Sequence, residues 1–121
     1  MRKSTLFILL MAVASVANAQ KPLRVYLVGD AGKMHYPYAE SLKAELADTA
    51  SSSVVIFLGD NIYPQGLPAA GRGRAKAEST LRAQLALAGD GRVPTYFIPG
   101  NHDWAQGRPR GWRHVLAQQA W

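Results

Sequence analysis

The chain has 121 residues, enough for one domain. It contains no cysteine, which excludes disulfide bonds, thiolate metal sites and cysteine nucleophiles. The 14 basic and 8 acidic residues give a net charge of +6, which favours anionic partners in general and does not single out nucleic acid.

The first 19 residues have the three parts of a secretory signal peptide. Arg2 and Lys3 form a basic start, an apolar stretch covers residues 6–16, and Ala17-Asn18-Ala19 provides the small residues of a cleavage site. The alternative is an uncleaved membrane anchor, but the apolar stretch is shorter than the roughly 20 residues that a span needs. We therefore predict an exported protein, periplasmic or secreted, without a stable membrane anchor. Cleavage would leave 12 basic against 8 acidic residues, a net charge of +4.

The remaining residues, 20–121, alternate short apolar runs with amphipathic stretches, which predicts the order βαβαβα. The strands are expected at residues 23–28, 54–58 and 93–98, and the helices at 37–49, 74–88 and from Pro109 onward. Strands joined by helical crossovers run parallel, so the predicted fold class is α/β. Because the last helical pattern continues to the final residue, we expect residues 20–121 to form the N-terminal portion of a larger domain.

Two helical stripes are expected to face the core. Residues spaced one helical turn apart share a face of the helix. The first helix offers Tyr38, Leu42 and Leu46, and the second offers Ala77, Leu81, Leu85 and Ala88.

Polar side chains follow all three predicted strands. Asp30 follows the first strand, Asp60 and Tyr63 follow the second, and Asn101 and His102 follow the third. The carboxyl ends of parallel strands meet at one edge of the sheet, so these side chains are expected to lie together. Two clustered carboxylates repel each other unless a proton or a cation lies between them. Carboxylate, phenol and amide oxygens are ligands of hard metal ions, so the sequence predicts a metal site.

The types of side chain in these loops suit phosphate chemistry. Asp60 has two oxygens and can bridge two metal ions, an arrangement that activates water for attack at phosphorus. A phenolate at Tyr63 favours Fe(III) over Zn(II). His102 either binds a metal or protonates the leaving oxygen, and Asp103 is expected to orient its imidazole. Each loop alone is better explained as a turn or a helix cap, so the prediction depends on the combination.

The combined loops resemble the first three motifs of the calcineurin-like metallophosphoesterases. The matching blocks are Asp-x-Gly at 30–32, Gly-Asp-x-x-Tyr at 59–63 and Gly-Asn-His-Asp at 100–103. Gly32 and Tyr63 place the resemblance closest to the purple acid phosphatase branch, because most other branches have a metal-binding histidine at the position of Gly32. The resemblance implies a two-sheet α/β sandwich flanked by helices and a phosphorylated small-molecule substrate.

The resemblance also implies a binuclear metal centre. Asp30, Asp60 and Tyr63 would hold Fe(III), while Asp60 and Asn101 would hold a divalent Fe, Zn or Mn ion. His102 would contact the scissile phosphate or its leaving group. In the family, further histidine ligands lie downstream, the last of them in a Gly-His-x-His block. The three histidines of this chain include none in such a block, so both metal shells are expected to be incomplete within it, and His35 and His114 are expected to be exposed.

Two other functions stay open. A non-catalytic exported binding module, or a decayed fragment, would keep these loops without retaining both metals. A nucleic-acid binder would use basic clusters with nearby aromatic residues, and one cluster, Arg108, Arg110 and Arg113, lies close in sequence to Trp104 and Trp112. We interpret the basic clusters as solvated or phosphate-steering charges and predict no nucleic-acid partner.

Overall fold

The structure is a computed structural model that describes residues 21–121. The predicted signal peptide therefore lies outside the described residues. Within residues 21–121, no helix has both the length and the apolar character that crossing a membrane requires.

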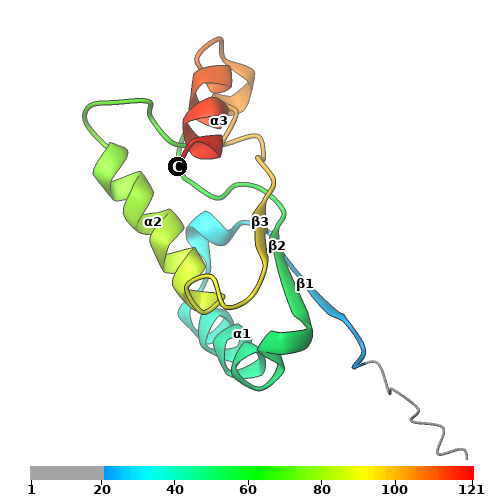
Figure 1. The fold of residues 1–121 in the computed structure, drawn as a ribbon. Coiled ribbons are helices and arrows are strands. Elements are labelled where there is room, and N and C mark those ends of the chain that lie inside the picture. Colours follow the sequence, from blue (N-terminus) through cyan, green and yellow to red (C-terminus); the bar gives the residue numbers. More distant parts are fainter. Residues whose placement is uncertain (1–20) are drawn as a thin grey trace, which may run out of the picture.

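Within residues 21–121, three strands form one parallel sheet, in agreement with the predicted α/β class. They are β1 (Arg24–Val28), β2 (Ser53–Phe57) and β3 (Thr95–Phe97), and β2 lies between the other two (Figure 1). The register sets Leu27 opposite Ile56, and Ile56 opposite Tyr96, so these three residues form a row across the sheet.

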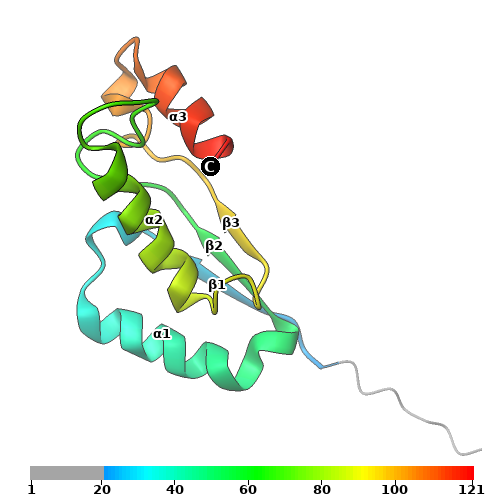
Figure 2. The ribbon, with the colours of Figure 1, turned by 60° about the vertical axis from the view of Figure 1, so that its left-hand side comes forward.

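The helices are α1 (Tyr36–Thr49), α2 (Arg74–Leu87) and α3 (Gly111–Gln119). The described part of the chain also contains three short 3-10 helices: η1 (Ala31–Lys33), η2 (Ala50–Ser52) and η3 (Ala105–Gly107). Helices α1 and α2 lie on the same side of the sheet, and α3 lies beyond the end of β3 (Figure 2). The two crossovers step across the sheet in the same direction, so right-handed connections place both helices on one face.

The core lies between the sheet and these two helices. Val55 and Phe57 of β2 are fully buried there, and the ring of Phe57 stacks on that of Phe97 at a centroid distance of 4.8 Å. Leu46 of α1 packs into the same cluster. A second buried cluster lies between α2 and the loop after β2, and it contains Ile62, Leu67, Ala77 and Leu81.

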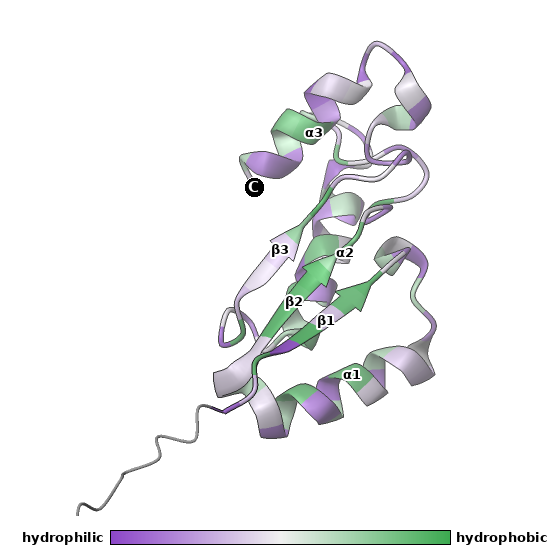
Figure 3. Ribbon diagram, turned by 90° about the vertical axis from the view of Figure 1, so that its right-hand side faces the viewer, coloured by the Kyte–Doolittle hydropathy of each residue, from purple (hydrophilic) through white to green (hydrophobic). Residues whose placement is uncertain are grey.

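The opposite face of the sheet is apolar and uncovered in the part of the chain that the structure describes. Figure 3 views this face with β1 and β2 in the foreground, coloured as hydrophobic, and no helix in front of them. Val25, Leu27 and Tyr96 are 51%, 61% and 60% exposed on it.

The structure corrects three details of the predicted helices. The last helix begins at Gly111 and not at Pro109, which lies in a turn closed by a 2.8 Å bond from the Gly111 N–H to the Arg108 carbonyl. Tyr38 is 71% exposed, because the first turn of α1 faces a hollow beside the edge strand β1. In α2 the buried polar residue Gln84 packs against the core, and Leu85 is only half-buried.

Candidate metal centre

The three strand-end loops meet at one edge of the sheet. The loop after β1 is tied to the loop after β2 by a 3.0 Å hydrogen bond from the Gly32 N–H to the Asp60 carbonyl. Asp30 and Asp60 both have a φ of 53°, in the left-handed region, where an aspartate is tolerated better than most residues. Two non-glycine residues in this conformation at adjacent strand ends are typical of a functional site.

Tyr63 connects the two carboxylates. Its hydroxyl donates a 2.5 Å hydrogen bond to Asp30 Oδ1 and lies 3.3 Å from Asp60 Oδ2. Three hard oxygen donors from two loops therefore converge, which is the kind of donor set that suits a hard cation. Within residues 21–121 no three His, Cys, Asp or Glu side chains are grouped to hold a metal, so this convergence depends on the phenol.

The surroundings of Tyr63 strongly favour its protonated form. The hydrogen bond to Asp30 is the main cause, and removal from solvent and the negative charge of Asp60 add to it, so the pKa of Tyr63 is well above its ordinary value. The same two carboxylates that hold the phenolic proton also attract cations. Lys33 adds a positive charge, with its Nζ 4.1 Å from the centroid of the Tyr63 ring.

Asp60 also contacts the third loop. Its Oδ1 accepts a 2.8 Å hydrogen bond from the backbone N–H of His102. This contact needs glycine at position 100, because a Cβ there would lie 2.4 Å from Asp60 Oδ1 and from the Asp60 backbone nitrogen. Asn101 lies between Gly100 and His102, and its side chain is exposed. The structure thus brings Asp30, Asp60 and Tyr63 into direct contact and places Asn101 in the adjoining turn.

The imidazole of His102 is fixed by a backbone carbonyl. Its Nδ1 lies 2.8 Å from the Pro64 oxygen, and a carbonyl can only accept, so Nδ1 carries the hydrogen and donates it. The ring centroid lies 4.2 Å from that of Tyr63. The partner of Nδ1 therefore leaves Nε2 as the ring nitrogen available for a substrate.

Asp103 does not have the predicted contact with the His102 imidazole. It is fully buried, and its two oxygens accept bonds from the backbone N–H groups of Asn61, Ile62 and Gly100 and from the Asn61 side chain, at 2.9–3.3 Å. Burial raises the pKa of Asp103, although the three backbone N–H groups oppose this. Asp103 joins the loops after β2 and β3, and the sequence could not reveal this because three of its four hydrogen-bond donors are backbone groups.

Other residues that position these loops were not predicted. Gln84 of α2 is buried and donates a 2.8 Å hydrogen bond to the Asn61 carbonyl. Its place among Ala77, Leu81 and Ala88 on one helical face was a usable signal, since a polar residue in an apolar stripe needs a partner. His114 is half-buried, contrary to the expectation of an exposed residue, and its Nδ1 bonds the Gln65 carbonyl.

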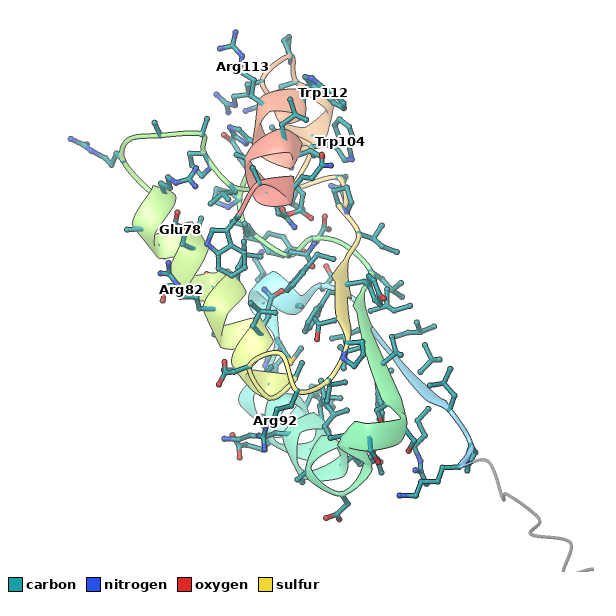
Figure 4. All side chains as sticks on the ribbon, in the orientation of Figure 1. Glu78, Arg82, Arg92, Trp104, Trp112 and Arg113 are labelled. Carbon is teal, nitrogen blue, oxygen red and sulfur yellow. The ribbon has the colours of Figure 1, made fainter. Side chains whose placement is uncertain are left out.

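An aromatic and basic surface lies next to the third loop. Trp104 and Trp112 stack at a centroid distance of 5.8 Å, and Figure 4 shows them side by side near α3, with Arg113 at the same end of the molecule. Arg108, Arg110 and Arg113 are all exposed. The absence of a nucleic-acid partner stays a prediction.

Comparison with known proteins decides the family. A model of the calcineurin-like phosphoesterase family matches residues 23–120. The chain belongs to this family. Comparisons with curated proteins and with solved structures give no significant match. Calcineurin-like phosphoesterases are metal-dependent hydrolases that act on phosphorylated substrates and generally bind two metal ions, and the predicted family and hydrolase class are thus confirmed.

Proposed function

We propose that this calcineurin-like phosphoesterase is an exported hydrolase with a binuclear metal centre, similar to the purple acid phosphatases. The contacts of Asp60 carry the proposal. Its Oδ2 faces the Tyr63 hydroxyl, which also bonds Asp30, and its Oδ1 faces the backbone N–H of His102, next to Asn101. One oxygen of Asp60 thus lies beside Asp30 and Tyr63, and the other lies beside the turn that carries Asn101. A carboxylate placed in this way is suited to bridge two cations.

The residues present fit this assignment. Asp30, Asp60 and Tyr63 would hold one ion, for which the phenol favours Fe(III). Asp60 and Asn101 would hold a divalent Fe, Zn or Mn ion. When bound, such a pair neutralises charge on phosphoryl oxygens and lowers the pKa of water. Two carboxylates, a phenol and an amide do not complete both shells, so the centre would also require water or further side chains of the protein.

The chain's own residues would orient the substrate and move a proton. The Pro64 carbonyl fixes the His102 ring, so that Nε2 can face the leaving oxygen and give it a proton when the ring is charged. Lys33, held over the Tyr63 ring, would attract the phosphate by its charge. We assign catalysis to His102, while Asp103 would act as a positioning residue.

The proposed branch is supported by the packing around Gly32. A Cβ at this position would lie 2.8 Å from the carbonyl oxygens of Asp60 and Asn61. A histidine, which most other branches have there, would require the two loops to move apart. Tyr63, in contact with Asp30, supplies the ligand type that is characteristic of the purple acid phosphatases.

The test is the substitution Asp60→Asn in the full-length protein. We expect loss of bound metal and of phosphomonoester turnover, because a neutral amide cannot bridge two cations. Asp90→Asn is the matched control, since Asp90 also follows a glycine and has a φ of 51° but lies in the exposed turn after α2. Metal content by mass spectrometry and release of phosphate are the two measurements. Wild-type metal content in Asp60→Asn would refute the bridging role.

A non-catalytic binding module is the second candidate. It is favoured by the absence of any cluster of three His, Cys, Asp or Glu side chains within residues 21–121. This candidate predicts that the full-length protein binds phosphate but retains no metal after purification in metal-containing buffer. Two equivalents of metal per chain would exclude it.

A further inference from the structure

A hollow opens beside Asp30, between the edge strand β1 and helix α1. Its volume is about 380 Å³, and the loop that joins β1 to α1, coloured cyan in Figure 2, lines one end. The neighbouring residues Asp30 and Lys33 belong to this lining. The hollow therefore reaches Asp30, one of the candidate metal ligands.

The walls of the hollow are mostly apolar or aromatic. They are formed by Tyr26, Leu27, Val28, Met34, Tyr38 and Leu42. Tyr38 is 71% exposed on the helix side of the hollow, so a bound apolar group would remove aromatic surface from water there. A cavity of roughly 150 Å³ already accommodates benzene, so this hollow has room for an aromatic ring with substituents.

The charges are at the end of the hollow that meets the metal centre. Lys33 lies over the Tyr63 ring, whose hydroxyl bonds Asp30. With a cation held by Asp30, as the proposed function requires, a phosphoester whose phosphate lies beside Lys33 at this end would direct its organic group along the apolar walls. The polarity of the hollow thus matches a molecule with one anionic end and one apolar end.

We propose that this hollow binds the organic group of the substrate, and that the preferred substrates are phosphomonoesters of phenols or of similarly flat apolar alcohols. This inference rests on the proposed function, because it takes the Asp30 end as the phosphate site. Tyr38 is the main specificity residue, since it offers the largest exposed aromatic surface in the hollow. Small polar phosphomonoesters would leave these walls in water.

The test compares two stable phosphonates on the full-length, metal-loaded protein. Phenylphosphonate and methylphosphonate share the anionic group, and neither has an ester bond to hydrolyse. We expect phenylphosphonate to bind roughly tenfold more tightly by calorimetry, because only its ring can fill the hollow. Tyr38→Ser should lower that advantage roughly threefold or more and leave methylphosphonate binding unchanged. Tyr96→Ser, on the open face of the sheet and 60% exposed, is the matched control.

The possible results separate this inference from the proposed function. Equal affinities for the two phosphonates, or an unchanged advantage in Tyr38→Ser, would overturn the aromatic pocket while binding of methylphosphonate still supports the phosphate site. If neither phosphonate binds to the wild type or to Asp60→Asn, both this inference and the proposed function are overturned. An advantage that Tyr38→Ser reduces and Tyr96→Ser preserves would establish the pocket.

Discussion

In the proposed metal centre, the phenol of Tyr63 would decide which metal the site prefers. Its hydroxyl bonds Asp30 and faces Asp60, and both carboxylates stabilise a proton on it. A cation that binds between the same oxygens must displace this proton, so only an ion with a strong preference for phenolate is expected to compete well. Fe(III) is such an ion, whereas a divalent ion gains less from a phenolate.

The substitution Tyr63→Phe tests this preference. The Fe(III)-loaded wild type is expected to be coloured, because a phenolate bound to Fe(III) gives a charge-transfer band in the visible range. Tyr63→Phe should lose the band and bind Fe(III) at least tenfold more weakly, since the site then keeps only the oxygens of Asp30 and Asp60. Tyr96→Phe, which changes an exposed tyrosine on the sheet, should keep both. Visible spectroscopy and iron titration are the measurements, and a colourless, fully loaded wild type would exclude Tyr63 as a ligand.

At the scale of elements, the buried carboxylate of Asp103 joins the loops after β2 and β3. It accepts four N–H donors, three of them from the backbone of these loops. Both loops carry candidate metal ligands. The relative position of these ligands therefore depends on Asp103, which is not itself a candidate metal ligand. Gln84 adds a connection from α2 to the same loop through the Asn61 carbonyl.

Asp103→Asn should destabilise the protein and misplace the two loops. The new amide group would face N–H donors in place of an acceptor oxygen, and we expect a loss of about 2–3 kcal/mol in the free energy of unfolding. Urea unfolding should show a lower midpoint with an unchanged slope. Asp48→Asn, at an exposed position near the end of α1, is the control and should leave the midpoint within error. An unchanged midpoint in Asp103→Asn would contradict this role.

The sequence predicted the parts of this arrangement that are set locally. The apolar runs and the glycine before Asp60 and before Asn101 mark the strand ends, and parallel connections then bring these ends together without further information. The contacts of Asp103 and His102 were not predictable in this way. They depend on which backbone groups of a distant loop come within reach, and Asp103 next to His102 in sequence wrongly suggested a direct contact between them.

The exposure of Tyr38 has the same kind of cause. Helical spacing correctly relates Tyr38, Leu42 and Leu46 to one face of α1, and the structure buries Leu46 and half-buries Leu42. The sheet is wide enough to cover this face at Leu46 and only partly at Leu42, and it leaves Tyr38 in the first turn uncovered. Spacing along a helix therefore predicts the direction of a side chain and leaves its burial to the neighbouring elements.

For the molecule as a whole, the most important feature is the unequal covering of the sheet. Both crossover helices cover one face, and the row formed by Leu27, Ile56 and Tyr96 lies on the other. Contiguous apolar surface of this kind promotes association in water. The strand edges of β1 and β3 add unpaired backbone groups within residues 21–121, which favours edge-to-edge contact as well.

We therefore expect a protein consisting of residues 20–121 to self-associate through the open face. The double substitution Val25→Lys and Tyr96→Lys should reduce this association, because two charges on the exposed face make its burial unfavourable. Ala75→Lys and Ala83→Lys, at exposed positions on α2, form the matched control with the same added charge. Sedimentation velocity over a range of concentrations is the measurement. If the control pair disperses the assemblies as well as the first pair does, net charge and not the open face governs association, and a wild-type monomer at every concentration would contradict the prediction outright.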